Sequence, residues 1–357
     1  MPENRMAKRG SRQTTYAGAG VDINLASQAK KRIAQLARAT LTPQVLSGVG
    51  FFGGLYEFKG YRKPVLVSSV DSVGTKIKIA IALNQHDTVG IDIVNHCIND
   101  ILSSGASPLF FLDYIGIGKL VPERVEAIVS GLAKACQDTG CALIGGETAE
   151  LPGVYSGDDY DLVGCIIGVV AKDRIIMGKD VQAGDAIIGL PSSGLHTNGY
   201  SLARKVFGET ASRLNVRSAE LGRTIGEALL EPHVCYYGPL KPLLRRVKGL
   251  AHITGGGAMI GNIPRSLPAG LAARLDSAKW TVPPIFTLLQ RKGRIELREM
   301  YRTFNMGVGM VVICAPENAA RIARAVPGAG IIGEVVRQTG EARVIIDGAG
   351  YRHDKVG

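Results

Sequence analysis

The stretch PVLVSSVDSVGTK, residues 64–76, decides how the first half of the chain is interpreted. Residues 64–70 form a short apolar run rich in β-branched side chains, which predicts a β-strand. Asp71 ends this run, and the sequence Ser-Val-Gly-Thr-Lys follows at once. The spacing brings a carboxylate, a flexible backbone and the cation of Lys76 together, and Mg²⁺ prefers one or two carboxylates plus phosphate oxygens. Asp71 therefore suits a nucleotide-bound metal and Lys76 a phosphate, but a capping Asp71 with a solvated Lys76 fits the spacing equally well.

Similar apolar runs recur along the rest of the chain. They predict further strands at residues 108–118, 141–145, 161–171, 184–191, 250–253, 306–315, 330–336 and 342–347. Helical patterns lie between them, at about 22–40, 75–84, 91–104 and 122–138 and from residue 200 onward. Strands that alternate with helices indicate an α/β (mixed α+β) fold in which mixed sheets are packed with helices.

The length of 357 residues is that of two domains. Residues 172–183 turn polar between two apolar strands, which marks the predicted boundary. Residues 1–15 are polar and basic and predict a flexible tail. We therefore expect an N-terminal domain at 16–172 and a C-terminal domain at 173–357.

The charge of the chain is unevenly distributed. The formal net charge is +11, yet residues 71–161 hold thirteen acids and five bases, a local net charge of −8. An acidic middle inside a basic chain favours a metal together with anions. A nucleic-acid surface would combine clustered Arg and Lys with aromatic residues, and only 6% of these residues are aromatic. We expect no nucleic-acid partner.

The sequence also bears on location. No apolar run approaches the roughly 18 residues of a membrane span, and the first residues do not resemble a secretory signal. The six cysteines show no C-x-x-C spacing and predict free thiols in a reducing compartment. We expect a cytoplasmic protein with no membrane partner.

The stretch GIDIVNHCINDIL, residues 90–102, predicts a helix with an unusual polar face. At about 100° per residue the polar side chains share one side of the helix: Asp92, Asn95, His96, Asn99 and Asp100. A solvated helix face normally carries Lys and Glu, whereas these short side chains suit a lined cleft or a metal shell. For His96, a polar-face histidine is the more common outcome and a ligand the less common one.

Three glycine-rich loops follow strands and are candidates for binding anions. They are GGETAELPG at 145–153, SSGLHTNGY at 192–200 and HITGGG at 252–257. Glu147 can approach a phosphate or metal beside its glycines, and His196 can act as an acid or base near neutral pH. Ordinary glycine turns with solvated acids, and capping by Thr197 or Asn198, are equally compatible with these loops.

Several well-known signatures are absent. The sequence has no G-x-x-x-x-G-K-[ST], no complete G-x-G-x-x-G, no G-x-S-x-G and no zinc-like ligand set. The residues alone therefore indicate a Mg²⁺-dependent, phosphate-handling α/β enzyme that uses none of these motifs.

The motifs together resemble one family. In order, they are YAGAGVDI (16–23), DSVGTK (71–76), GIDIVNHCINDIL (90–102), GASPLFFLDY (105–114), GGETAELPG (145–153), SSGLHTNGYSL (192–202), HITGGG (252–257) and FNMGVGM (304–310). This ordered set resembles the phosphoribosylformylglycinamidine cyclo-ligase (aminoimidazole ribonucleotide synthetase) family over residues 16–347. Ser72, Leu195 and Thr197 stand where the family usually has Gly, Pro and Ser.

The resemblance implies a fold and a reaction. The fold is a two-domain α/β protein of a superfamily that binds ATP without a P-loop, with N-terminal sheets that pair across a homodimer. The reaction converts formylglycinamidine ribonucleotide and ATP into aminoimidazole ribonucleotide, ADP and phosphate, through an iminophosphate, in purine biosynthesis. The implied cofactors are ATP and Mg²⁺, with K⁺ as a candidate second ion.

The resemblance also assigns site residues. Metal ligands are expected at Asp71, Asp92 and Asp100. Contacts to ATP are expected from Gly53, Gly54, Asp71, Gly74, Thr75, Lys76, Asn95 and Glu147. Substrate contacts are expected from Ser193, Gly194, His196, Asn198, Thr254, Gly255 and Gly256. His196 and Lys76 are the expected catalytic residues, with His196 as the acid or base.

Two alternatives differ in function. The first is another ATP-dependent enzyme of the same superfamily, such as a formylglycinamidine synthetase, a selenophosphate synthetase, a thiamine-phosphate kinase or a hydrogenase-maturation protein. These enzymes are expected to lack the HITGGG and GGETAELPG spellings. The second alternative is a nucleotide-sensing module without turnover.

Overall fold

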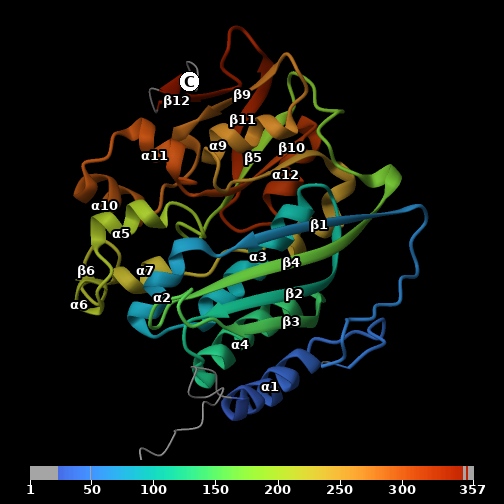
Figure 1. Cartoon of the computed structure of the whole chain (residues 1–357). Helices are drawn as coiled ribbons and strands as arrows, with labels where there is room; N and C mark the ends of the chain where they lie inside the picture. The colour runs from blue at the N-terminus through green and yellow to red at the C-terminus, as the bar shows by residue number, and fades with distance from the viewer. Residues whose placement is uncertain (1–22, 49, 349–350, 353–357) are drawn as a thin grey trace, which may run out of the picture.

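The computed structural model describes residues 23–48, 50–348 and 351–352 and contains two main β-sheets, each packed with helices (Figure 1). The predicted tail at 1–15 lies outside the described residues, as does Asp22 at the start of the first predicted helix. That helix, α1, spans Ile23–Arg38. The predicted fold class, with mixed sheets in two domains, is confirmed.

The first sheet has four strands in the order β1-β4-β2-β3. These strands are β1 (Pro64–Ser72), β2 (Ser107–Ile117), β3 (Ala142–Glu150) and β4 (Tyr160–Ala171). β4 runs antiparallel to both β1 and β2, whereas β2 and β3 are parallel. The parallel pair needs a crossover, and α4 (Pro122–Thr139) supplies it.

Helices α3 (Asp87–Leu102) and α4 pack closely together against this sheet. Their contact depends on two glycines. A Cβ at Gly90 would lie 2.1 Å from the carbonyl oxygen of Ile128, and one at Gly131 would lie 1.9 Å from that of Asp87. Any side chain at either position would push the helices apart. The contact fixes how α3 lies, and α3 carries part of the site described below.

The second sheet has seven strands in the order β13-β12-β9-β11-β5-β10-β8. Its strands are β5 (Ala186–Pro191), β8 (Val247–His252), β9 (Leu271–Asp276), β10 (Val308–Cys314), β11 (Gly330–Arg337), β12 (Val344–Asp347) and β13 (Tyr351–Arg352). Neighbouring strands are antiparallel apart from the parallel pair β9 and β12. β6 (Arg217–Ser218) and β7 (Arg223–Thr224) form a separate two-stranded ribbon.

The remaining helices are short. They are α2 (Ile77–Leu83), α5 (Tyr200–Phe207), α6 (Ala211–Leu214), α7 (Ile225–Leu230), α8 (Tyr237–Leu240), α9 (Ala258–Asn262), α10 (Pro284–Gly293), α11 (Leu297–Thr303) and α12 (Pro316–Ala323). The 3-10 turns are η2 (Gly74–Lys76), η3 (Lys172–Arg174), η4 (Lys241–Arg246), η5 (Ile263–Ser266) and η6 (Ser277–Lys279). Within the described ranges, every helix is too short or too polar to cross a membrane.

One face of the four-stranded sheet carries α3 and α4, and no helix of the described residues covers its other face, called the open face below (Figure 1). On β1 the side chains alternate, and those of Leu66 and Val70 on the open face are each 63% exposed. Val70 pairs with Cys165 on β4, and Cys165 pairs with Leu112 on β2. An apolar row therefore crosses the open face from strand to strand.

Candidate active site between the two sheets

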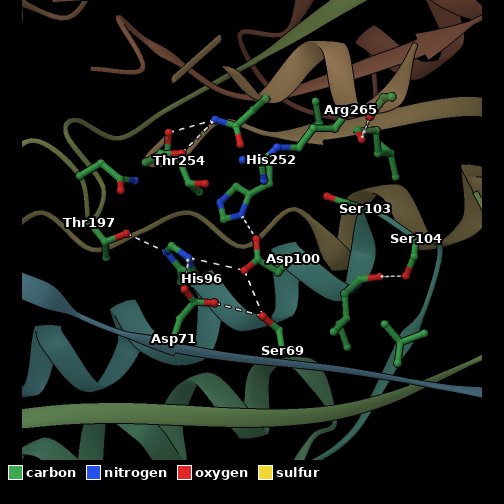
Figure 2. A pocket seen from close by; sticks show the side chains of 18 of the residues that line it. Ser69, Asp71, His96, Asp100, Ser103, Ser104, Thr197, His252, Thr254 and Arg265 are labelled. Carbon is green, nitrogen blue, oxygen red and sulfur yellow. Dashed lines mark hydrogen bonds and ion pairs between the residues drawn. The ribbon is translucent and has the colours of Figure 1, made fainter. Parts of the chain in front are cut away.

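A cavity of about 750 Å³ lies between the N-terminal and C-terminal halves of the chain (Figure 2). From the N-terminal half, β1 and α3 contribute Asp71, His96 and Asp100 to its wall. From the C-terminal half come the end of β8, the loops that follow two strands, α9 and η5. Those residues are Thr197, Asn198, His252, Thr254, Gly255, Asn262 and Arg265.

Two carboxylates share one wall of the cavity. Ser69 Oγ lies 3.1 Å from Asp71 Oδ2 and 3.3 Å from Asp100 Oδ2, so one hydroxyl touches both acids. Asp71 is part-buried at the end of β1, and Asp100 sits on the last turn of α3. The two acids predicted from different motifs are therefore brought together, in a pair that suits a hard divalent cation.

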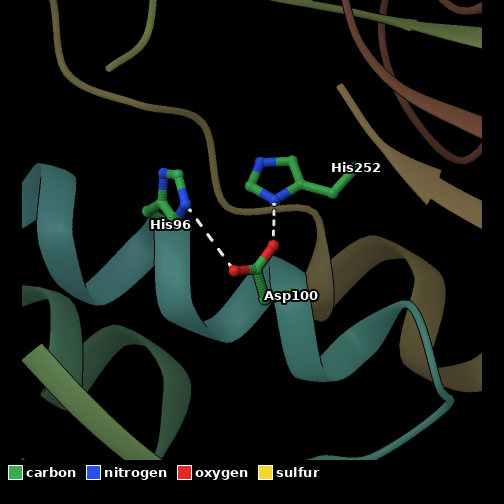
Figure 3. A group of neighbouring side chains, drawn as sticks. All are labelled: His96, Asp100 and His252. Atoms are coloured by element: carbon green, nitrogen blue, oxygen red, sulfur yellow. Dashed lines mark hydrogen bonds and ion pairs between the residues drawn. The ribbon is translucent and has the colours of Figure 1, made fainter. Parts of the chain in front are cut away.

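Two histidines flank Asp100 (Figure 3). His252 Nδ1 lies 2.8 Å from Asp100 Oδ1. His96 Nε2 lies 3.6 Å from both Asp100 Oδ2 and Asp71 Oδ1, while its Nδ1 lies 2.8 Å from Thr197 Oγ1. His96 comes from α3 and His252 from β8, so the contacts join the two halves of the chain.

The neighbours push the two carboxyl pKa values in opposite directions. Burial, followed by the nearby Asp100, raises the pKa of Asp71 to about 7. Burial alone would also raise the pKa of Asp100, but the hydrogen bond from His252 and the electrostatic effect of that histidine outweigh burial and hold the pKa below its ordinary value. Burial and the nearby His252 lower the pKa of His96 to about 4. At neutral pH, Asp100 is ionised, His96 is neutral and Asp71 is poised between its two forms.

The opposite wall offers groups that suit a phosphate. Arg265 reaches the cavity from η5, and Thr254 and Gly255 lie in the loop after β8. Asn262 Nδ2 donates to the carbonyl oxygens of Thr254 at 3.1 Å and Gly255 at 3.3 Å, which holds this loop in place. A Cβ at Gly255 would lie 3.0 Å from Asn198 Oδ1, so glycine lets the two loops approach closely.

Of the predicted ligands, the cavity is lined by Asp71, Gly74, Asp100, Asn198, Thr254 and Gly255. Two other predicted site residues, Lys76 in η2 and Asp92 in α3, pair with each other instead. Lys76 and Asp92 are fully buried and form an ion pair with Nζ and Oδ2 2.7 Å apart. Lys76 Nζ also donates to the carbonyl oxygen of Glu231 at 2.8 Å. In this arrangement neither charge is exposed to a bound phosphate or metal.

The rest of the polar face of α3 holds a segment of the C-terminal half. Asp92 Oδ1 accepts from the backbone N–H of His233 at 2.8 Å, and Asn95 Nδ2 donates to the carbonyl oxygen of that residue at 2.7 Å. Asn99 donates to the carbonyl oxygen of Val234 at 2.7 Å and accepts from the N–H of Tyr236 at 3.0 Å. This face therefore joins the two halves, and its end at His96 and Asp100 reaches the cavity.

His196 lies behind the cavity wall. It is fully buried, its ring stacks on His233 with centroids 3.9 Å apart, and Nε2 accepts from the N–H of Ser193 at 3.2 Å. Burial and the surrounding cationic neighbours hold its pKa well below the ordinary value. Ser193 Oγ donates to the carbonyl oxygen of Pro232 at 2.6 Å. The described cavity lining includes neither residue, nor Gly194 or Gly256.

The remaining predicted residues lie elsewhere. Glu147 is exposed on β3, next to Tyr114 in the sheet. Thr75 is exposed, and its Oγ1 lies 3.2 Å from Ser201 Oγ. Gly53 and Gly54 lie in an exposed loop before β1. The structure does not bring these four residues to the described wall of the cavity.

His252 and Arg265 also line the cavity and were not predicted, and His96, expected more as an ordinary polar-face histidine than as a ligand, lies in the cavity wall. One signal could have found His252, because it ends a buried strand shortly before a glycine loop, and Asp71 lies near the end of β1 in a similar way. Arg265 follows a helix whose position depends on the whole C-terminal sheet, and no local pattern marks it.

Two family descriptions match most of this fold. AIR synthase related protein, N-terminal domain, matches residues 57–170, and AIR synthase related protein, C-terminal domain, matches residues 182–346. A relative from Thermoanaerobacter sp. (strain X514), named phosphoribosylformylglycinamidine cyclo-ligase, is 50% identical over 332 residues, covering 91% of this chain and 98% of the relative. The chain belongs to the phosphoribosylformylglycinamidine cyclo-ligase family. The resemblance seen in the motifs is confirmed, and the family is one of ligases.

Other comparisons agree with this membership. A cyclo-ligase of the same name from Geobacillus kaustophilus (strain HTA426) is 50% identical over 334 residues, covering 91% of this chain and 96% of the relative. The crystal structure of thiamine-monophosphate kinase from Stenotrophomonas maltophilia K279a has a TM-score of 0.65 at 17% identity, covering 89% of this chain and 96% of that one. A hydrogenase maturation protein HypE in complex with ATP has a TM-score of 0.55 at 16% identity, covering 87% and 88%. These structures share the fold of the cyclo-ligase family.

Proposed function

We propose that the chain closes the imidazole ring of formylglycinamidine ribonucleotide with ATP, forming aminoimidazole ribonucleotide, ADP and phosphate in de novo purine biosynthesis. The observation that carries the proposal is the 50% identity to named cyclo-ligases along 91% of the chain. The cavity agrees with it, because carboxylates line one wall and phosphate-binding groups the other.

The chemistry explains why such a site needs two kinds of group. A formamide oxygen is a poor leaving group, but phosphorylation turns it into an iminophosphate. The amidine nitrogen can then attack the same carbon and expel phosphate, which closes the five-membered ring. Phosphoryl transfer depends mainly on positioning and on neutralising charge. The groups that line the cavity could both position the phosphates and neutralise their charge.

Asp71 and Asp100 fit Mg²⁺, since both are carboxylates at one wall and share the hydroxyl of Ser69. When bound, Mg²⁺ would neutralise phosphate charge. On the other wall, Arg265 and the loop of Thr254 and Gly255 would hold phosphate oxygens. We propose ATP as the nucleotide that this chain binds. A HypE protein of the same fold has been solved in complex with ATP, which supports this choice.

The other predicted roles stay proposals. Lys76 and His196 are proposed as catalytic residues, although in this conformation both are buried behind the wall. Contacts from Asn95, Glu147, Gly53 and Gly54 would require a different arrangement of those groups around bound nucleotide. K⁺ as a second ion and a cytoplasmic location belong to the same proposal.

We also propose a homodimer. The open face of the four-stranded sheet exposes Leu66 and is crossed by the apolar row that starts at Val70. Exposing such an apolar face to water costs free energy, and the same face of a second copy of the chain would cover it. The resemblance to a family whose N-terminal sheets pair in a dimer supports this arrangement.

The test of the proposed reaction is product formation by the purified full-length protein. With ATP, Mg²⁺ and formylglycinamidine ribonucleotide, we expect aminoimidazole ribonucleotide and ADP in equal amounts. Asp71→Asn should lower kcat/KM by at least about 100-fold, while the matched variant Asp161→Asn, on β4 away from the described cavity lining, should keep wild-type rates. ADP release with thiamine monophosphate in place of this substrate, or no product, would contradict the proposal.

A further inference from the structure

We propose that His96, Asp100 and His252 form a binding site for a divalent transition-metal ion of the zinc type. Their ligand atoms all lie within 4.8 Å of one another. Zinc–nitrogen bonds are about 2.0–2.1 Å long, so the ligand atoms of a tetrahedral site lie about 3.3 Å apart. Asp100 Oδ1 lies 2.8 Å from His252 Nδ1 and Asp100 Oδ2 lies 3.6 Å from His96 Nε2, so each carboxylate oxygen faces one histidine at a separation near that value.

Each imidazole also has a partner for its second nitrogen. His96 Nδ1 lies 2.8 Å from Thr197 Oγ1, and His252 Nε2 lies 2.9 Å from His233 Nε2. A histidine that binds a metal almost always donates its other N–H in this way, which fixes the tautomer and the ring.

One arrangement of protons satisfies all these contacts with a metal present. His96 donates from Nδ1 to Thr197, and His252 donates from Nε2 to His233. His233 then carries its own proton on Nδ1, which lies 3.5 Å from Thr197 Oγ1. The lone pairs of His96 Nε2 and His252 Nδ1 are left directed at Asp100. The metal takes the place of the proton that otherwise lies between His252 and Asp100.

The ligand types select the metal. Imidazole nitrogen suits zinc, copper, iron and nickel, whereas Mg²⁺ takes oxygen ligands. Three protein ligands leave a further coordination position open, as in zinc sites that accept a water or substrate atom. All three residues line the cavity, so the open position faces a space that ions can reach.

The site joins two parts of the fold. His96 and Asp100 lie four residues apart on α3, whereas His252 ends β8. The bound ion would tie the helix of the N-terminal half to the sheet of the C-terminal half. Ion binding to the folded state alone would then raise the free energy of unfolding.

This inference does not depend on the proposed reaction. Zinc binding is measured without ATP or substrate, and its failure leaves the cyclo-ligase assay unaffected. Asp100 belongs to both proposals, but the two histidines distinguish them, because only the zinc site needs imidazole nitrogen.

The experiment titrates metal-free, full-length protein with Zn²⁺ in competition with a coloured chelator, and repeats the titration with Mg²⁺. We expect one Zn²⁺ bound at least about 100-fold more tightly than Mg²⁺. His96→Gln and His252→Gln should each lower the affinity for this Zn²⁺ ion by at least about 100-fold, and Thr197→Val should lower it by about 10-fold. His86→Gln is the matched control, because His86 contacts Tyr160 and Asn84 outside the cluster.

The six cysteines are free thiols and can also take up zinc. Equal zinc binding by wild type and both histidine variants would therefore place the ion on other groups and overturn the proposal. Should a variant fail to fold, crystals of the wild-type protein grown with Zn²⁺ decide the matter. An anomalous peak within bonding distance of His96 Nε2 and His252 Nδ1 is expected, and a peak elsewhere or none refutes the site.

Discussion

At the residue scale, the site rests on two carboxyl groups of the same chemical type with different protonation. Asp100 is held ionised by its hydrogen bond to His252, whereas burial and then the nearby Asp100 raise the pKa of Asp71. Such opposed pKa values are common where acids act on substrates or metals. The sequence identified both acids from strand-end and helix-face positions. It could not predict their difference, because that arises from a histidine 152 positions away along the chain.

The raised pKa of Asp71 predicts that nucleotide binding depends on pH. The carboxyl group takes up a proton as the pH falls through about 7, and a protonated acid is a poor metal ligand. The affinity for the Mg²⁺ complex of an ATP analogue should therefore rise with pH and level off above 7, changing about tenfold per unit below it.

Calorimetric titrations at several pH values between about 5.5 and 8.5 measure this dependence around the raised pKa. In Asp71→Asn the affinity should be lower, and only the smaller pH dependence of the nucleotide itself should remain. The same slope in the wild type and in this variant would contradict the role of Asp71.

The buried pair of Lys76 and Asp92 predicts a large effect on stability. Lys76→Met leaves the carboxylate of Asp92 buried without its partner and should lower the free energy of unfolding by about 3–5 kcal/mol. Removing both charges in Lys76→Met/Asp92→Asn, which keeps an acceptor for the N–H of His233, should restore much of that loss. Urea denaturation followed by circular dichroism measures both effects.

Lys78 provides the control, because it pairs with Asp159 at a partly exposed position, where such pairs contribute at most about 1 kcal/mol. A Lys76→Met protein with wild-type stability and no affinity for nucleotide would show instead that Lys76 binds phosphate. The sequence allowed either a phosphate-binding or a solvated Lys76 and did not predict the buried pair, because the burial of Lys76 depends on Asp92 and on Glu231 in the other half of the chain.

Among the secondary-structure elements, α3 shows what a helical sequence pattern can and cannot predict. The pattern correctly separated an apolar face packed on the sheet from a face of short polar side chains. It could not say what the polar face meets. The structure shows that most of this face binds the backbone of residues 233–236, and that only its end borders the cavity.

Asn99 is the residue of α3 that tests this interface most simply. Asn99→Leu keeps the side-chain size but leaves the carbonyl oxygen of Val234 and the N–H of Tyr236 without their partner. Unsatisfied buried groups cost about 1–3 kcal/mol each, so we expect a loss of about 2–4 kcal/mol. Denaturation measures the loss, and hydrogen exchange at Tyr236 should become faster.

Lys134→Ala is the comparison for that variant, because Lys134 forms an exposed pair with Asp138 on α4. Its effect should stay below about 0.5 kcal/mol. If Asn99→Leu were equally mild, α3 would not hold the two halves together through these hydrogen bonds.

At the scale of the whole molecule, the fold class and most of the strands could be predicted from local patterns. The strand expected at 64–70 is confirmed as β1, and the helix expected at 122–138 as α4. β9 was not predicted, because its short sequence, LAARLD, contains one basic and one acidic side chain, Arg274 and Asp276. Strand order and the meeting of loops from two halves depend on contacts far apart in the chain, which no local pattern contains.

The open sheet face predicts the oligomeric state. Leu66→Glu/Val70→Glu places two charges in the proposed dimer interface and should shift the protein from dimer to monomer in sedimentation velocity runs. Val216→Glu, at a position that is 50% exposed beside β6, should leave the dimer intact. A wild-type monomer at all concentrations, or a dimer that tolerates both glutamates, would contradict the proposed pairing.

The central claim is that the carboxylates of β1 and α3 and the loops of the C-terminal half act on the same nucleotide and substrate. A crystal structure of the full-length protein with Mg²⁺ and a non-hydrolysable ATP analogue tests it most directly. We expect a Mg²⁺ ion bound by Asp71 and Asp100 at about 2.0–2.1 Å, with the phosphates directed into the cavity. Phosphates bound elsewhere, with both carboxylates remote from the metal, would contradict it.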